Sequence, residues 1–178
     1  RAAIIEGLPA KQFVVEPWTA PIKFEHTIWT IRNPEIEPPI ERRIAVDRSN
    51  KTLWLNNPKN DAEFIVFLYR ENMIKRLADK PKMLSQILLD LRYSGFVVLE
   101  NLSDIKDLDD EECMRLKKWE KKFTFPQAHS GEPFLLYFWT WSQRTGNLEQ
   151  WTVEIGDTKM NVKREVFEKH LGLFLPKL

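Results

Sequence analysis

The sequence has a single cysteine, Cys113, which excludes an intramolecular disulfide and any metal centre built from clustered cysteines. Such a chain is typical of a reducing compartment, so we expect an intracellular protein, with cytoplasm, nucleus and mitochondrial matrix equally compatible. Long apolar runs are also lacking. The most apolar stretch, residues 134–141, is much shorter than the roughly 18 residues that cross a membrane, and we expect no membrane span.

Glycine is scarce, and the chain has no excess of charge of either sign. None of the 6 glycines stands in GxGxxG or GxxxxGK spacing, which argues against Rossmann-type and Walker-type nucleotide binding. The 27 Lys and Arg residues balance 26 Asp and Glu residues, for a net charge of +1. A protein whose whole surface attracts phosphate is therefore not expected, whereas a local basic patch remains compatible with this composition.

Proline is concentrated at the N-terminal end, because six of the 11 prolines precede residue 42. Each proline removes a backbone donor and disfavours helix, so we expect residues 1–41 to form an extended, proline-rich arm with short strands near 13–15 and 28–31. Such an arm can lie over its own core or along a neighbour. The remaining residues, 42–178, have the length and composition of a single domain.

The apolar spacing of the rest predicts an α+β fold. A mixed, mainly antiparallel sheet would be built from two hairpins, with about four helices packed on it. The first hairpin joins residues 43–47 to 52–55, and the second runs on from 134–139. A buried strand is expected at 96–99. Helices are expected at 60–77, at 83–91, at 107–122 and, closing the chain, at 162–171.

Both hairpin registers can be argued from the apolar side chains. A two-residue loop at 49–50 would pair Val46 with Leu53 and place four apolar side chains on one face. In the second hairpin, a three-residue loop at 145–147 would place Trp141 opposite Trp151 and Trp139 opposite Val153. A two-residue loop would set these aromatic residues opposite polar ones, so we prefer the first register.

Seven tryptophans are the most unusual feature of the composition. Core packing accounts for those of the second hairpin, since aromatic side chains favour burial. Trp18 and Trp29 lie on the arm instead, and with Phe13 they are the candidates for a protein interface. The leading hypothesis is therefore a non-catalytic protein-binding or structural module, a subunit or domain of a larger assembly whose partners are other protein subunits.

Basic residues cluster on the helix expected at 107–122. They give a nucleic-acid hypothesis, an RNA- or DNA-associated domain, and the candidates are Arg115, Lys117, Lys118, Lys121 and Lys122. A second basic group lies at 75–82. The competing interpretation is a solvated helix face partly neutralised by the acids at 111, 112 and 120, and we favour it because the net charge is close to zero.

A metal-dependent phosphoesterase or nuclease is the third hypothesis. It would use strand-end acids, but these have no paired spacing, so we assign no metal ligand; the acids are Asp47, Asp90, Glu100 and Asp104. The three histidines, His26, His129 and His170, are scattered. Ser130 lies in no nucleophile elbow, and Cys113 is expected to pack as a small apolar residue. We therefore assign no catalytic residue and no cofactor, and favour a protein that is not an enzyme.

Overall fold

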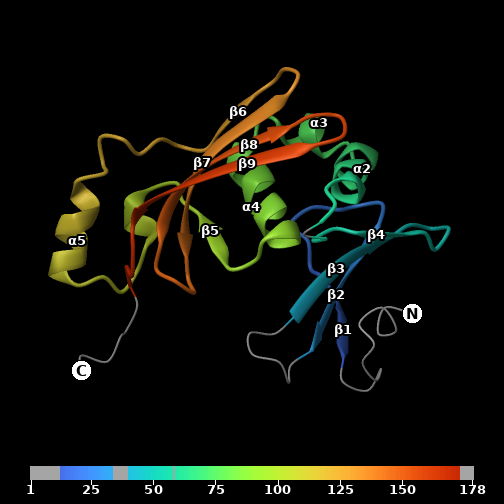
Figure 1. The fold of residues 1–178 in the computed structure, drawn as a ribbon, viewed down its shortest axis with the longest axis horizontal. Coiled ribbons are helices and arrows are strands. Elements are labelled where there is room, and N and C mark those ends of the chain that lie inside the picture. Colours follow the sequence, from blue (N-terminus) through green and yellow to red (C-terminus); the bar gives the residue numbers. More distant parts are fainter. Residues whose placement is uncertain (1–12, 34–39, 58, 173–178) are drawn as a thin grey trace. The chain divides into compact units, whose positions relative to one another are not determined.

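A computed structural model describes residues 13–33, 40–57 and 59–172 (Figure 1). By its internal contacts the chain divides into two compact units, Arg1–Met73 and Ile74–Leu178, and each is described by itself. Residues 13–33, which the sequence assigns to an arm, contribute strands to the sheet of the first unit. Among the described residues, no helix is long and apolar enough to cross a membrane.

The first unit contains a four-stranded antiparallel sheet in the order β1-β2-β3-β4. Its strands are β1 (Val14–Pro17), β2 (Thr27–Asn33), β3 (Ile40–Val46) and β4 (Thr52–Trp54), shown in blue and cyan in Figure 1. Ile28 of β2 and Ala45 of β3 pair directly and are buried on one face of this sheet, whereas Ile31 is buried on the other face.

The predicted hairpin of β3 and β4 is present, but its expected register was wrong by one residue. Val46 pairs with Thr52, not with Leu53, because the loop has three residues, 48–50, closed by the bond from Asp47 N–H to the Lys51 carbonyl. The Asp47 carboxylate accepts hydrogen bonds from the backbone N–H groups of Ser49 and Lys51, and Asn50 adopts a left-handed φ of 60°. This side-chain capping stabilises the longer loop.

The helix expected at 60–77 is divided into α2 (Ala62–Arg70) and α3 (Met73–Leu77). Asn72, with a φ of 52°, separates the two, which a continuous helix would not permit. Phe64, Phe67 and Leu68 of α2 are buried, and α2 contacts β4.

The second unit contains a five-stranded antiparallel sheet in which β7 is central, as its apolar sequence predicted. The order is β5-β7-β8-β9, and β6 pairs with β7. The strands are β5 (Phe96–Val98), β6 (Gln127–His129), β7 (Phe134–Ser142), β8 (Leu148–Ile155) and β9 (Met160–Glu168).

The expected register of the β7–β8 hairpin was wrong. Trp139 pairs with Gln150 and Phe138 with Trp151, so Trp139 and Trp151 lie on opposite faces of the sheet. The loop has four residues, 143–146, and Gly146 supplies a φ of 64°. The error came from the assumption that all three tryptophans share one face, whereas both faces of this sheet bury aromatic rings.

The closing helix expected at 162–171 was also wrong, because the segment forms β9. Pairing with β8 places Val162 opposite Val153 and Arg164 opposite Trp151. The Arg164 guanidinium lies 4.5 Å from the centre of the Trp151 ring and donates two hydrogen bonds to the buried Glu149 carboxylate. These tertiary contacts override a local pattern that also fits a helix.

Helices cover both faces of the second sheet. α4 (Pro81–Arg92) has the predicted apolar stripe and contacts β5 and β7. α5 (Asp110–Lys117), capped by Asp109 and Glu112, is shorter than the helix expected at 107–122; its Leu116 joins Trp139 in a buried cluster. A short 3-10 helix spans Leu102–Asp104. With two antiparallel sheets and helices packed on them, the α+β prediction is confirmed.

Candidate functional site

A buried histidine–glutamate pair lies in the first unit, where β2 begins and α2 ends. The side chains of His26 and Glu71 are only 6% and 0% exposed, and His26 Nδ1 lies 2.6 Å from Glu71 Oε1. The same carboxylate accepts hydrogen bonds from the backbone N–H groups of Glu25 and His26. One side chain thus holds the start of β2 against the last turn of α2.

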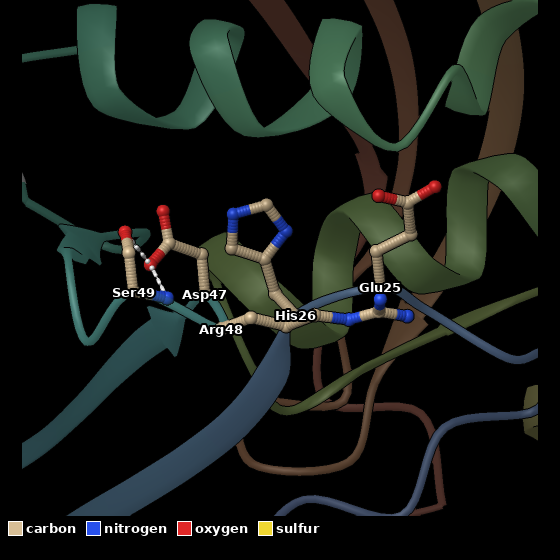
Figure 2. Close-up of a pocket in the computed structure, with 5 residues that line it drawn as sticks. All are labelled: Glu25, His26, Asp47, Arg48 and Ser49. Carbon is tan, nitrogen blue, oxygen red and sulfur yellow. Dashed lines mark hydrogen bonds between the residues drawn. The ribbon is translucent and has the colours of Figure 1, made fainter.

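The hydrogen bonds of Glu71 also determine the tautomer of His26. Because both carboxylate oxygens already accept backbone donors, the imidazole must donate to Glu71 from Nδ1, so that the lone pair of the Nδ1–H tautomer is on Nε2. Nε2 is buried and has no hydrogen-bond partner among the described residues. In Figure 2 this nitrogen is on the Asp47 side of the ring.

The imidazole adjoins a polar cavity of about 350 Å3, lined by Glu25, His26, Asp47, Arg48 and Ser49 (Figure 2). The hydrogen bond from the Ser49 hydroxyl and those from the backbone N–H groups of Lys51 and Ser49 lower the pKa of Asp47 below its ordinary value. The nearby charge of His26 acts in the same direction, and partial burial opposes these effects. Asp47 is therefore an ionised acceptor at neutral pH.

The cavity orients an imidazole but does not assemble a nucleophile. Ser49 is exposed, and its hydroxyl donates to Asp47 Oδ1 at 2.7 Å instead of to His26. A serine nucleophile requires a hydrogen bond to its base, which these two side chains do not make. Within the described ranges, no three His, Cys, Asp or Glu side chains gather as a metal site would require.

Within each unit, the described acids and histidines considered from the sequence do not gather in one site. Asp47 caps a turn in the first unit, whereas the other three acids lie in the second. Asp104 accepts from the backbone of Glu100 and Asn101, and Asp90 accepts from Gln86. His129 packs its ring on Tyr137, and His170 is exposed.

The predicted interface residues Phe13, Trp18 and Trp29 lie on or beside β1 and β2. Trp18 stacks on Phe24 with ring centres 6.1 Å apart. Trp29 is half-buried and pairs with Pro17 of β1 and Ile44 of β3. Their role as interface residues stays a prediction.

One face of the first sheet carries an apolar row that crosses all four strands. Residues that pair directly across strands point to the same side of a sheet. The register therefore aligns the side chains of the row, which are Pro17, Trp29, Ile44 and Trp54. The last three are half-buried, not buried, and the Arg42 guanidinium lies 5.0 Å from the centre of the Trp54 ring. Val15, on the same face, is 56% exposed.

β1 is an edge strand, and no described strand pairs with its outer side. The bond from Trp18 N–H to the Ile28 carbonyl marks a hydrogen-bonded pair. Because such pairs alternate along an antiparallel ladder, the backbone N–H and C=O of Val15 point away from β2. Pro17 is the next residue of β1 whose backbone nitrogen points away from β2, so its missing N–H removes no hydrogen bond between the two strands. Val15 therefore presents an exposed side chain and outward-directed backbone groups that pair with no strand of the described residues.

The predicted basic residues occupy α5 and the turns after it. Arg115 donates to Glu168 and to the Lys169 carbonyl, and Lys122 lies 5.3 Å from the centre of the Trp119 ring. The other three, Lys117, Lys118 and Lys121, are exposed.

Comparison with family models, with curated proteins and with solved structures finds no match to this chain. The site must therefore be interpreted from its own geometry.

Two features of these sites were not predicted from the sequence. Glu71 stands at the end of a helix, 45 residues from its partner His26, and no local spacing links them. The apolar row was missed because Ile44 and Trp54 were assigned to the wrong register. Asp47 followed by Ser49 and Asn50 was the available signal, since an Asx-type turn favours the longer loop.

Proposed function

We propose that this protein is a non-catalytic protein-binding module of a larger assembly, and that it binds a partner subunit through the apolar row and the outer edge of β1. The observation that carries the proposal is the register that aligns Trp29, Ile44 and Trp54 on one face, next to the exposed Val15. Partly exposed tryptophans in a contiguous apolar surface are typical of binding sites.

The chemistry of this surface favours an extended partner segment with apolar side chains. The outward N–H and C=O of Val15 offer main-chain hydrogen bonds, as in the addition of a strand to a sheet edge. Alternate side chains of an added strand would then lie over the same face as Trp29. Arg42, placed over Trp54, gives the surface a polar border.

The test replaces Val15 with glutamate, which buries a charge only when a partner covers the strand. Because Val15 is 56% exposed, V15E should leave folding almost unchanged. Val66 of α2, 39% exposed in the same unit, provides the matched control V66E. Tagged protein is expressed in its native cells, and the partner proteins retained at high salt are quantified.

We expect V15E to reduce partner retention by about tenfold or more, since desolvating an unpaired carboxylate costs several kcal/mol. V66E should retain partners as the wild type does. Equal retention by V15E and wild type would contradict the proposal. Equal loss by both variants would also contradict it, because the effect would then follow charge and not this surface.

A further inference from the structure

A second surface lies in the other unit, at the end of α5. The turns that follow the helix continue its winding, with bonds from the N–H groups of Trp119 and Phe123 to carbonyls three and four residues before them. Side chains three or four residues apart on such a winding are neighbours. Lys118 is therefore next to both Lys121 and Lys122. We call residues 117–122 the basic segment.

The lysines of the basic segment are not neutralised by ion pairs. Lys117, Lys118 and Lys121 are exposed and form no ion pair in the described part of the chain. With four lysines and one glutamate, Glu120, the segment carries a formal charge of +3. Arg115, beside it, binds the carboxylate of Glu168 in β9.

The low net charge of the whole chain does not cancel this local field. Charges are screened within about 8 Å at physiological ionic strength. The acids of α5 stand at its first turn, and the last of them, Glu112, precedes Lys118 by six residues, which is roughly 9 Å along the helix axis. The carboxylates of Asp109 and Glu112 already accept hydrogen bonds from backbone N–H groups: the two side chains cap the helix, and Glu112 also accepts from the Gly172 N–H.

Aromatic rings accompany the lysines. Phe125, three residues beyond the basic segment, is 63% exposed, which is unusual for a side chain of its size. Trp119 is half-buried, and the Lys122 ammonium lies above its ring and 5.7 Å from that of Phe167. Three residues of chain span at most roughly 10 Å, so ring and ammonium groups lie within the reach of a few nucleotides.

We propose that the basic segment and the exposed ring of Phe125 bind single-stranded nucleic acid, with lysines on the phosphates and the ring stacked on a base. Proteins that bind single strands without sequence preference combine these two elements. A duplex would leave Phe125 without a base to stack on, which favours the single strand. This site is independent of the protein-binding surface of the first unit.

The test measures the binding of a fluorescein-labelled oligo(U) of 12 nucleotides to the full chain by fluorescence anisotropy, at several salt concentrations. The neutralising variant is K118Q/K121Q. Its matched control is K159Q/K163Q, which removes two exposed lysines from the same unit, outside both basic groups. F125A tests the stacking, and circular dichroism checks that each variant is folded.

We expect K118Q/K121Q to weaken binding and to flatten the slope of log affinity against log salt by about 1.4, since each single-strand phosphate contact contributes about 0.7. F125A should lose about five- to tenfold in affinity, at the lower end of the range for base stacking, with an unchanged slope. K159Q/K163Q should bind as the wild type does.

Three results would overturn the proposal. Absence of binding at low salt would do so directly. Equal losses in the two lysine variants would show attraction by net charge alone. If F125A binds the oligonucleotide as tightly as the wild type does, and the protein binds vesicles that contain phosphatidylserine as tightly as the oligonucleotide, the surface binds anions in general and not nucleic acid in particular.

Discussion

Replacing Glu71 with alanine should destabilise the first unit more than any surface change. The carboxylate is fully buried and accepts the backbone N–H groups of Glu25 and His26 and the imidazole Nδ1–H. E71A removes the acceptor and leaves these donors in place. Unsatisfied buried donors lose their hydration without compensation, which is more costly than removing both partners of a bond.

The expected magnitude follows from the donors that water cannot reach. The N–H of Glu25 is only part-buried and can be hydrated, so two donors count, the N–H and the Nδ1–H of His26. At roughly 1–3 kcal/mol for each, E71A should cost about 2–6 kcal/mol. E71Q keeps the volume and one acceptor oxygen, so it should cost less than E71A.

Native-state hydrogen exchange of β2 and α2 amides is the suitable assay, because a chain of two units need not unfold in one step. Nitrogen NMR of the His26 ring gives a second readout: the Nδ1–H tautomer should dominate in the wild type and lose its preference in E71A. If E71A changes the free energy of opening by less than about 0.5 kcal/mol and leaves the tautomer unchanged, the reasoning is refuted.

Three further changes test other contacts. S49A should raise the pKa of Asp47 toward its ordinary value, because it removes the hydrogen bond from the Ser49 hydroxyl. Since the folded pKa is lowered, the contribution of Asp47 to stability is present above about pH 3.9 and is lost as the pH falls through the folded pKa. A carbon NMR titration that gives the same pKa for Asp47 in S49A and in the wild type would contradict this. G146A should lower the melting temperature, because a Cβ at this φ of 64° would lie 2.6 Å from a backbone nitrogen; an unchanged melting curve would count against the loop as described. R164A leaves the carboxylate of Glu149 buried without its guanidinium partner, so it should lower the free energy of unfolding, measured with denaturant, by about 1–3 kcal/mol. The control K163A, at an exposed neighbouring residue, should lower it by less than about 0.5 kcal/mol. Equal losses in the two variants would disprove the role of the Arg164–Glu149 pair.

The sequence predicted those elements whose pattern is local. The apolar stripe of α4 and the strand at 96–98 could be predicted because periodicity and a terminal glycine, Gly95, are short-range signals. A helix was also expected where α5 lies, but from 107, whereas the structure begins it at Asp110 after the N-cap Asp109. The α+β class follows from the order of such elements.

What failed depends on distant partners. The segment 160–168 has apolar residues at spacings that fit a helix or a strand, and only the pairing with β8 and the contacts of Arg164 decide between them. The registers of both hairpins changed with loop lengths that side chains set, Asp47 in one loop and Gly146 in the other. For the same reason, neither the Glu71–His26 pair nor the apolar row could be predicted.

The central claim, a partner bound along the outer edge of β1, is tested most directly by residue-resolved hydrogen exchange of Val15 and Glu16 in the free protein and in the assembly captured from native cells. In the free protein, the outward N–H of Val15 should exchange fast, whereas that of Glu16, directed to β2, should be protected. The account predicts that Val15 becomes protected in the assembly while Glu16 changes little. Fast exchange of Val15 in both states would contradict it.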